Sequence, residues 1–254
     1  MTDTHTHLDL QKDPAKSLDR ASDLAALLTV GTDPRRNRRA IRFAEANENV
    51  YAAVGLHPTE AELLSPEVEA DLRTFVAHPR VRAVGETGFD FYWDRASEAA
   101  QQRALELQAE LALAHDHVLV FHVRSKEGQD RAERALIAWL LANRPPRFVL
   151  HAFSGHEKLL ETALTLGGYV SLAGNLTHRK KKRLREIARA LPRDRVVVET
   201  DAPYITPEPK RGRDNQPAYV LYTLAELAEL WELPFHEAEA ITDANAERLF
   251  RWKR

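Results

Sequence analysis

Short apolar runs alternate with longer amphipathic stretches along the chain, and few folds are compatible with that order. The stretches at 34–47, 98–115, 128–143 and 157–167 repeat apolar residues every three to four positions, as helices do. Eight runs have the length and composition of buried strands, and they are THTHLDL (4–10), AALLTVG (25–31), VYAAVG (50–55), VRAVGE (81–86), VLVFH (118–122), RFVLH (147–151), GYVSLA (168–173) and RVVVET (195–200). The alternation predicts βα units around a parallel sheet.

Eight such units in 254 residues match the size and order of a (β/α)8 TIM barrel, an α/β fold. A doubly wound open sheet would usually have fewer strands and a glycine-rich phosphate-binding turn, and the sequence contains neither G-x-G-x-x-G nor a Walker motif. No low-complexity linker or internal repeat divides the chain, so we expect a single domain over residues 1–254. Residues 217–254 are expected to be terminal helices that close the barrel.

Composition narrows the functional classes. A formal net charge of −2 provides no global basic field for nucleic acid, so a polyanion would have to contact a local patch. The absence of cysteine excludes disulfides, Cys-ligated zinc and a thiol nucleophile. The chain begins without an apolar signal segment and contains no run of about 18 apolar residues. We therefore expect a cytoplasmic protein without a membrane partner. The sequence does not define the oligomeric state, and a monomer is consistent with it.

The barrel prediction separates the histidines into two groups, because reacting residues of this fold lie at the C-terminal ends of the strands. Six metal-competent side chains lie on or directly after five predicted strands, and these are His5, His7, Glu86, His122, His151 and Asp201. The sequence therefore predicts a metal site at that rim. By contrast, His115 and His117 precede their strand, so we expect this second H-x-H pair at the opposite, stability face of the barrel. His78 also precedes its strand and His236 lies in a terminal helix, and we expect these two to be surface or capping residues.

Seven short blocks occur in order over residues 3–217, and they are DTHTHLDL, VGLHP, GETGFDFYW, FHVR, HAFSG, ETDAPY and PKRGRDNQP. In this order and spacing they resemble the TatD-type metal-dependent deoxyribonucleases of the amidohydrolase superfamily. The departures are small: Ala152 stands where the family usually has Cys, and Phe89 where it usually has Leu. Every position that the family uses to bind metal carries a suitable residue.

The resemblance implies two divalent metal ions bridged by Glu86, one held by His5, His7 and Asp201 and the other by His122 and His151. Imidazole suits zinc whereas carboxylates suit magnesium and manganese, so Mg, Mn and Zn all stay open. Two cations about 3.5–4 Å apart can share a hydroxide that attacks a phosphodiester. Glu86 and Asp201 are then the catalytic candidates, with Asp201 as the proton shuttle.

Five residues are candidates for substrate binding, and they are His57, Arg124, Ser154, His156 and Arg211. Arg124 suits a phosphate, whereas Ser154 and His156 begin a predicted helix whose free N–H groups favour anions. The run HRKKKR at 178–183 begins another predicted helix, where cations oppose the helix dipole and a polyanion would offset that cost. A solvated helix face is the alternative for this run, and Lys210, Arg211 and Arg213 are possible companions.

By resemblance we expect a 3′–5′ exonuclease that hydrolyses single-stranded or frayed DNA. A deacylase of aminoacyl-tRNA, or another carbonyl hydrolase, is the main alternative, because the same nucleophile attacks a carbonyl carbon. Glu86 occupies the strand end where a carbamylated lysine would be needed, which argues against that branch of the superfamily. A metal-dependent binding protein without turnover is a third possibility, and Asp201 argues against it because a binder needs no proton shuttle.

Overall fold

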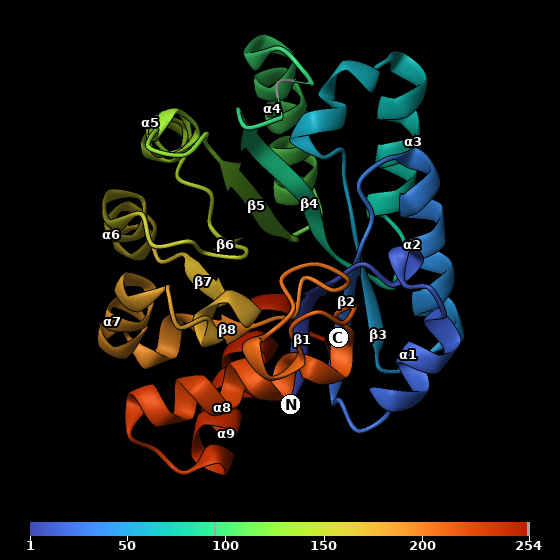
Figure 1. The fold of residues 1–254 in the computed structure, drawn as a ribbon. Coiled ribbons are helices and arrows are strands. Elements are labelled where there is room, and N and C mark those ends of the chain that lie inside the picture. Colours follow the sequence, from blue (N-terminus) through green and yellow to red (C-terminus); the bar gives the residue numbers. More distant parts are fainter. Residues whose placement is uncertain (94, 253–254) are drawn as a thin grey trace.

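A computed structural model of the protein describes residues 1–93 and 95–252. Within these residues, eight parallel strands are arranged side by side in chain order, with the helices outside them (Figure 1). The strands are β1 (Thr2–Thr6), β2 (Ala26–Val30), β3 (Val50–Val54), β4 (Val81–Asp90), β5 (Val118–Arg124), β6 (Phe148–Leu150), β7 (Tyr169–Leu172) and β8 (Val196–Val198). The predicted (β/α)8 barrel is confirmed.

A helix follows each of the first seven strands and covers the outside of the barrel. These helices are α1 (Pro14–Arg20), α2 (Pro34–Ala46), α3 (Pro66–Val76), α4 (Glu98–Ala114), α5 (Arg131–Asn143), α6 (Glu157–Thr165) and α7 (Lys182–Ala190). The sequence defines several of their starts: Asp33 and Ser65 each accept a hydrogen bond from the backbone N–H three residues later, and proline follows both. None of the described helices combines the length and apolarity needed to cross a bilayer.

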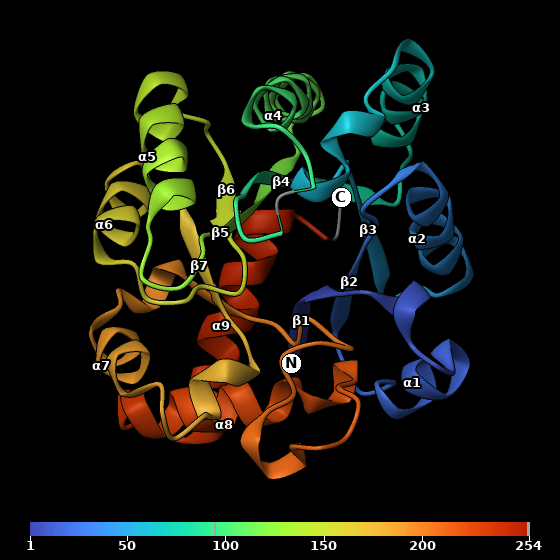
Figure 2. The same cartoon turned by 45° about the horizontal axis from the view of Figure 1, so that its top comes forward.

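The strands are packed between two apolar layers, one outside the barrel and one inside it. Alternate strand residues point outward against the helices, and the others point inward, where Leu28, Tyr51 and Val120 belong to a separate cluster. Two further helices, α8 (Val220–Trp231) and α9 (Phe235–Phe250), follow β8. Residues from the end of α9, including Phe250, join the inner cluster, and α9 passes behind the strands in Figure 2. The N-terminal end of the barrel is therefore filled, which leaves the C-terminal end for a site.

The seam between β1 and β8 is closed by the segment that follows β8. The N–H of Asp201 donates to the carbonyl of His5 at 2.9 Å, and the N–H of His7 donates to the carbonyl of Ala202 at 2.8 Å. Thr200 reinforces the seam by donating its N–H and its hydroxyl to the buried Asp3 carboxylate, at 2.9 and 2.6 Å. These bonds hold Asp201 beside the two N-terminal histidines.

The ends of the first and fourth strands differ most from the sequence expectation, by four residues each, whereas the other ends differ by two residues or fewer. The first strand ends at Thr6 instead of residue 10, because residues 8–10 form a 3-10 turn in which Leu10 donates its N–H to the carbonyl of His7. The fourth strand continues past Glu86 to Asp90, because residues 87–90 pair with 121–124 of β5. Gly88 permits this pairing: its φ is +129°, and a Cβ there would lie 2.3 Å from the carbonyl oxygen of His122.

Candidate metal centre

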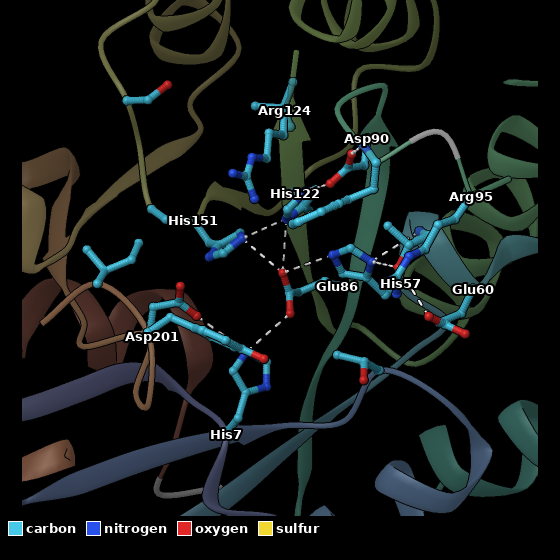
Figure 3. A pocket seen from close by; sticks show the side chains of 18 of the residues that line it. His7, His57, Glu60, Glu86, Asp90, Arg95, His122, Arg124, His151 and Asp201 are labelled. Atoms are coloured by element: carbon cyan, nitrogen blue, oxygen red, sulfur yellow. Dashed lines mark hydrogen bonds and ion pairs between the residues drawn. The ribbon is translucent and has the colours of Figure 1, made fainter. Parts of the chain in front are cut away.

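The six side chains predicted to bind metal converge at the C-terminal end of the barrel. They surround the floor of a pocket of about 820 Å³, and His5 lies buried beneath it. Figure 3 shows Glu86 at the centre, with His122 and His151 on one side and His7 and Asp201 on the other. His5, Glu86 and His122 belong to β1, β4 and β5, whereas His7 and His151 directly follow β1 and β6, and Asp201 stands three residues after the end of β8.

One group of ligand atoms gathers around Glu86 Oε1. The Nε2 atoms of His5 and His7 lie 3.5 and 3.4 Å from this oxygen. Asp201 Oδ1 lies 3.3 Å from His7 Nε2 and 3.8 Å from His5 Nε2. Neighbouring ligands of an ion with bonds of about 2.1 Å lie roughly 3.0–3.4 Å apart, so a small cation fits between these atoms with little adjustment.

A second group gathers around the other oxygen of the same carboxylate. Glu86 Oε2 lies 3.2 Å from His122 Nδ1 and 2.9 Å from His151 Nε2, and the two ring nitrogens are 3.2 Å apart. Each oxygen of Glu86 therefore faces its own pair of imidazoles. In this position the Glu86 carboxylate could bridge two adjacent ions, with one oxygen bound to each.

His5 provides an independent reason to place a cation here. Its side chain is fully buried, and among the residues that the structure describes neither ring nitrogen has a hydrogen-bond partner. A buried polar atom without a partner destabilises a fold by about 1–3 kcal/mol. A cation bound at Nε2 would remove that cost, and the mixed set of imidazole and carboxylate donors suits a divalent ion.

Further groups fix the orientation of the candidate ligands. His122 Nε2 lies 2.9 Å from Asp90 Oδ2, so with its hydrogen on Nε2 the ring can offer Nδ1 to an ion beside Glu86. His7 Nδ1 donates to the carbonyl of Val30 at 3.0 Å and so leaves Nε2 for an ion. Glu199 Oε1 lies 3.4 Å from His151 Nδ1 without a hydrogen bond between them, and it accepts the backbone N–H of Ala152 at 2.7 Å. Hydrogen-bond partners such as Asp90 and the carbonyl of Val30 set the tautomer of a metal-binding histidine.

Asp90 and Glu199 are not among the site residues predicted from the sequence. A signal for both existed, because each stands an even number of positions from a candidate ligand in or beside a strand: Asp90 four after Glu86, and Glu199 two before Asp201. In extended backbone such pairs share a face. Both carboxylates are buried, at 1% exposed.

The protonation of the site depends on the interaction between its negatively charged carboxylates and its imidazoles. Burial opposes ionisation of Glu86, but His151 and His122 hold the pKa of its carboxyl well below the ordinary range. Burial likewise works against charge on His7, but Asp201 and Glu86 raise its pKa to about 9. Without a cation, protonated imidazoles therefore neutralise the carboxylates. A divalent ion can replace these protons.

Three of the five substrate-binding candidates line the pocket, namely His57, Arg124 and Ser154. The other two lie outside its lining. His156 accepts the N–H of Leu159 at 3.2 Å and so serves as the N-cap of α6. Arg211 is exposed and pairs with Glu208 at 3.1 Å. A role of these two in binding substrate stays a prediction.

Three of the four histidines expected away from the site, His78, His115 and His117, are found at the other end of the barrel, and His236 lies in α9. His117 directly precedes β5 and bonds to the carbonyl of Val76 at 2.8 Å, and His115 caps the end of α4. His78, before β4, pairs with Glu45 at 3.1 Å. Strand direction therefore separates the two H-x-H pairs of this sequence, as the barrel argument requires.

Comparison with known proteins agrees with this geometry. Residues 2–251 match the model of the family described as TatD related DNase. The chain belongs to this family. It is 39% identical to an uncharacterized metal-dependent hydrolase TatD of Mycobacterium tuberculosis, over 98% of this chain and 97% of that protein. It is 32% identical to a 3′–5′ ssDNA/RNA exonuclease TatD of Cronobacter turicensis, over 97% and 94% of the two chains.

Among solved structures, the TatD homologue YjjV of Escherichia coli K12 superposes with a TM-score of 0.91 at 29% identity, covering 99% of this chain and 98% of that one. The chain is therefore a metal-dependent hydrolase with the TatD barrel.

Proposed function

We propose that this TatD-family hydrolase is a two-cation 3′–5′ exonuclease that acts on single-stranded or frayed DNA ends. One observation supports the proposal above all: the two carboxylate oxygens of Glu86 face two separate groups of imidazoles. The direction and strand form are taken from the relative in Cronobacter turicensis, which is named a 3′–5′ ssDNA/RNA exonuclease. When bound, two divalent cations would activate water and stabilise the attacking and leaving oxygens of a phosphodiester.

Asp201 is the residue that we assign to proton transfer. Burial opposes its ionisation, but His7 and the other nearby imidazoles lower the pKa of its carboxyl, so it is a carboxylate at neutral pH. Its Oδ1 faces His7 at 3.3 Å. Its other oxygen, Oδ2, is the atom that we expect to take a proton from the attacking water and to return it to the leaving 3′ oxygen.

His57 and Arg124 can hold the substrate phosphate. His57 Nδ1 accepts the N–H of Thr59 at 3.1 Å, so the ring hydrogen is on Nε2, which lies 3.8 Å from Glu86 Oε2. Burial and the nearby His122 lower the pKa of His57 to about 3, so it stays neutral and donates one hydrogen bond. Arg124 ends β5 two residues after His122 and adds a permanent positive charge to the pocket.

The test is degradation of a single-stranded DNA oligonucleotide that carries a fluorophore at its 5′ end. With Mg²⁺ or Mn²⁺ the wild-type protein should produce a ladder that shortens from the 3′ end, and EDTA should abolish it. His151→Ala should abolish cleavage, whereas the matched double change His115→Ala with His117→Ala should retain it.

Three further substrates define what the activity is. A closed single-stranded circle should resist, and efficient nicking would refute the exonuclease assignment. RNA of the same sequence tests whether the sugar matters. Release of the amino acid from an aminoacyl-tRNA, with no cleavage of any nucleic acid, would replace the proposal with the deacylase alternative.

A further inference from the structure

The segment directly after β4 presents two aromatic side chains to solvent. Trp93 is 51% exposed and Tyr92 is 39% exposed, and their ring centroids are 4.9 Å apart at an interplanar angle of 84°. Trp93 lines the pocket that contains the candidate metal centre. The other three tryptophans, at positions 139, 231 and 252, are at most 8% exposed. The core therefore does not explain the placement of Trp93.

The backbone of this aromatic pair is fixed to the metal centre by one carboxylate. The N–H groups of Tyr92 and Trp93 donate to Asp90 Oδ1 at 2.9 and 3.0 Å. The other oxygen of Asp90 accepts from His122 Nε2 at 2.9 Å. The neighbouring Phe91 donates its N–H to the carbonyl of Arg124 at 2.9 Å. The pair is thus held at a defined place relative to His122.

Two cations flank the aromatic rings. The guanidinium carbon of Arg124 lies 4.0 Å from the centroid of the Tyr92 ring and 5.6 Å from that of Trp93. Arg95 lies 5.6 Å from the centroid of Trp93. Figure 3 shows Asp90, Arg95 and Arg124 along the side of the pocket where His122 and His57 lie. Because Arg124 stacks closely on Tyr92, Trp93 is the more open of the two rings.

We propose that Trp93 is a stacking platform for a nucleobase of the substrate strand, supported by Tyr92, with Arg124 and Arg95 on the adjoining phosphates. This inference rests on the proposed nuclease function and adds to it where the strand lies. A single strand alternates flat bases with anionic phosphates, and the rim offers an open ring between two cations. Stacking on an aromatic ring tolerates all four bases but requires bases that are free of a duplex, so the subsite selects single strands without reading sequence.

Tryptophan fluorescence tests binding without turnover. The Asp201→Asn protein, loaded with Mg²⁺, is titrated with a single-stranded oligonucleotide and with a strand of equal length whose 3′-terminal nucleotides are abasic. Because three of the four tryptophans are buried, quenching should report on Trp93. The intact strand should quench and the abasic strand should quench far less. Trp93→Phe should lose the quenching. Equal quenching by both strands would overturn the proposal.

Steady-state kinetics test the same subsite during turnover. Trp93→Ala should raise KM for the intact strand roughly 5- to 150-fold, the range expected when one stacked base is lost, and Trp93→Phe should restore most of it. On the abasic strand, wild type and Trp93→Ala should be alike. Phe235→Ala removes another exposed aromatic, at 39% exposed on α9, and should leave KM unchanged.

The proposed nuclease function and the proposed stacking subsite are refuted by different results. Wild-type protein that does not shorten the intact strand refutes the nuclease function, whereas wild-type activity that Trp93→Ala leaves unchanged on that strand refutes the subsite alone.

Discussion

Replacement of Asp90 by asparagine should weaken metal binding although this residue is not itself a candidate ligand. In the structure Asp90 Oδ2 lies 2.9 Å from His122 Nε2 and can accept its hydrogen, so that in the metal-bound protein the lone pair of His122 Nδ1 is free for an ion beside Glu86. The amide nitrogen of an asparagine would place hydrogens against that Nε2–H. Either the contact becomes repulsive, or His122 moves its hydrogen to Nδ1 and can no longer bind an ion there.

Loss of such an orienting carboxylate typically costs 10- to 100-fold in metal affinity, which is about 1.4–2.7 kcal/mol. Asparagine retains one carbonyl oxygen, so it can still accept the backbone N–H groups of Tyr92 and Trp93 that now bond to Oδ1 at 2.9 and 3.0 Å. The fold and the aromatic segment should therefore persist. The expected defect is confined to the ion on the His122 side.

The assay is isothermal titration of chelator-treated protein with Mn²⁺, together with activity as a function of metal concentration. Asp33→Asn is the matched control, because Asp33 is a carboxylate of the same pocket whose role as N-cap of α2 asparagine can fulfil. Unchanged Mn²⁺ affinity in Asp90→Asn, or an equal loss in Asp33→Asn, would refute the orientation argument and leave only a general effect of charge.

Four other expectations follow from the metal site and from the basic run at 178–183. Asp201→Asn should retain much of its bound metal by elemental analysis while kcat falls by about 10²- to 10⁴-fold, and near-normal kcat with bound metal would remove Asp201 as proton shuttle. Lys180, Lys181 and Lys182 are exposed and have no ion-pair partner in the described part of the chain. If they bind the substrate backbone, neutralising them should raise KM and reduce the dependence of KM on salt concentration. An unchanged salt dependence would mean that the three lysines only form a solvated helix face. Metal binding near neutral pH should release protons, because the pKa of His7 is about 9 in the metal-free site, so identical calorimetric enthalpies in two buffers of different ionisation heat would contradict it. The same raised pKa stabilises the metal-free fold fully below about pH 6.5, and thermal melts of that form should lose this stability as pH rises through about 9.

The barrel and the candidate ligands could be predicted because both depend on local, repeated signals. Most of the predicted strands are apolar on both faces, and Glu86, His122 and His151 are metal-competent residues at the ends of such runs. The direction of a parallel strand then decides which end carries a site. His115 and His117 share the spacing of the N-terminal pair, but they precede their strand and lie at the filled end.

The remaining features depend on contacts between distant segments. Asp90 orients His122 only because β4 continues beyond Glu86 and pairs with β5, and the sequence TGFD at 87–90 does not have the apolar character of a buried strand. The ring of His156 is used as a helix cap, an alternative to binding that a single sequence cannot separate from a substrate contact. The sequence carries no signal that Trp93 is exposed, and only the structure shows it at the rim of the pocket.

Anomalous diffraction from crystals grown with Mn²⁺ would show whether Glu86 bridges two cations. We expect two anomalous peaks about 3.5–4 Å apart. Each should lie within bonding distance of one oxygen of Glu86, with the first peak beside His5, His7 and Asp201 and the second beside His122 and His151. A single ion, or a pair of ions that Glu86 does not contact, would contradict the bridging role of Glu86.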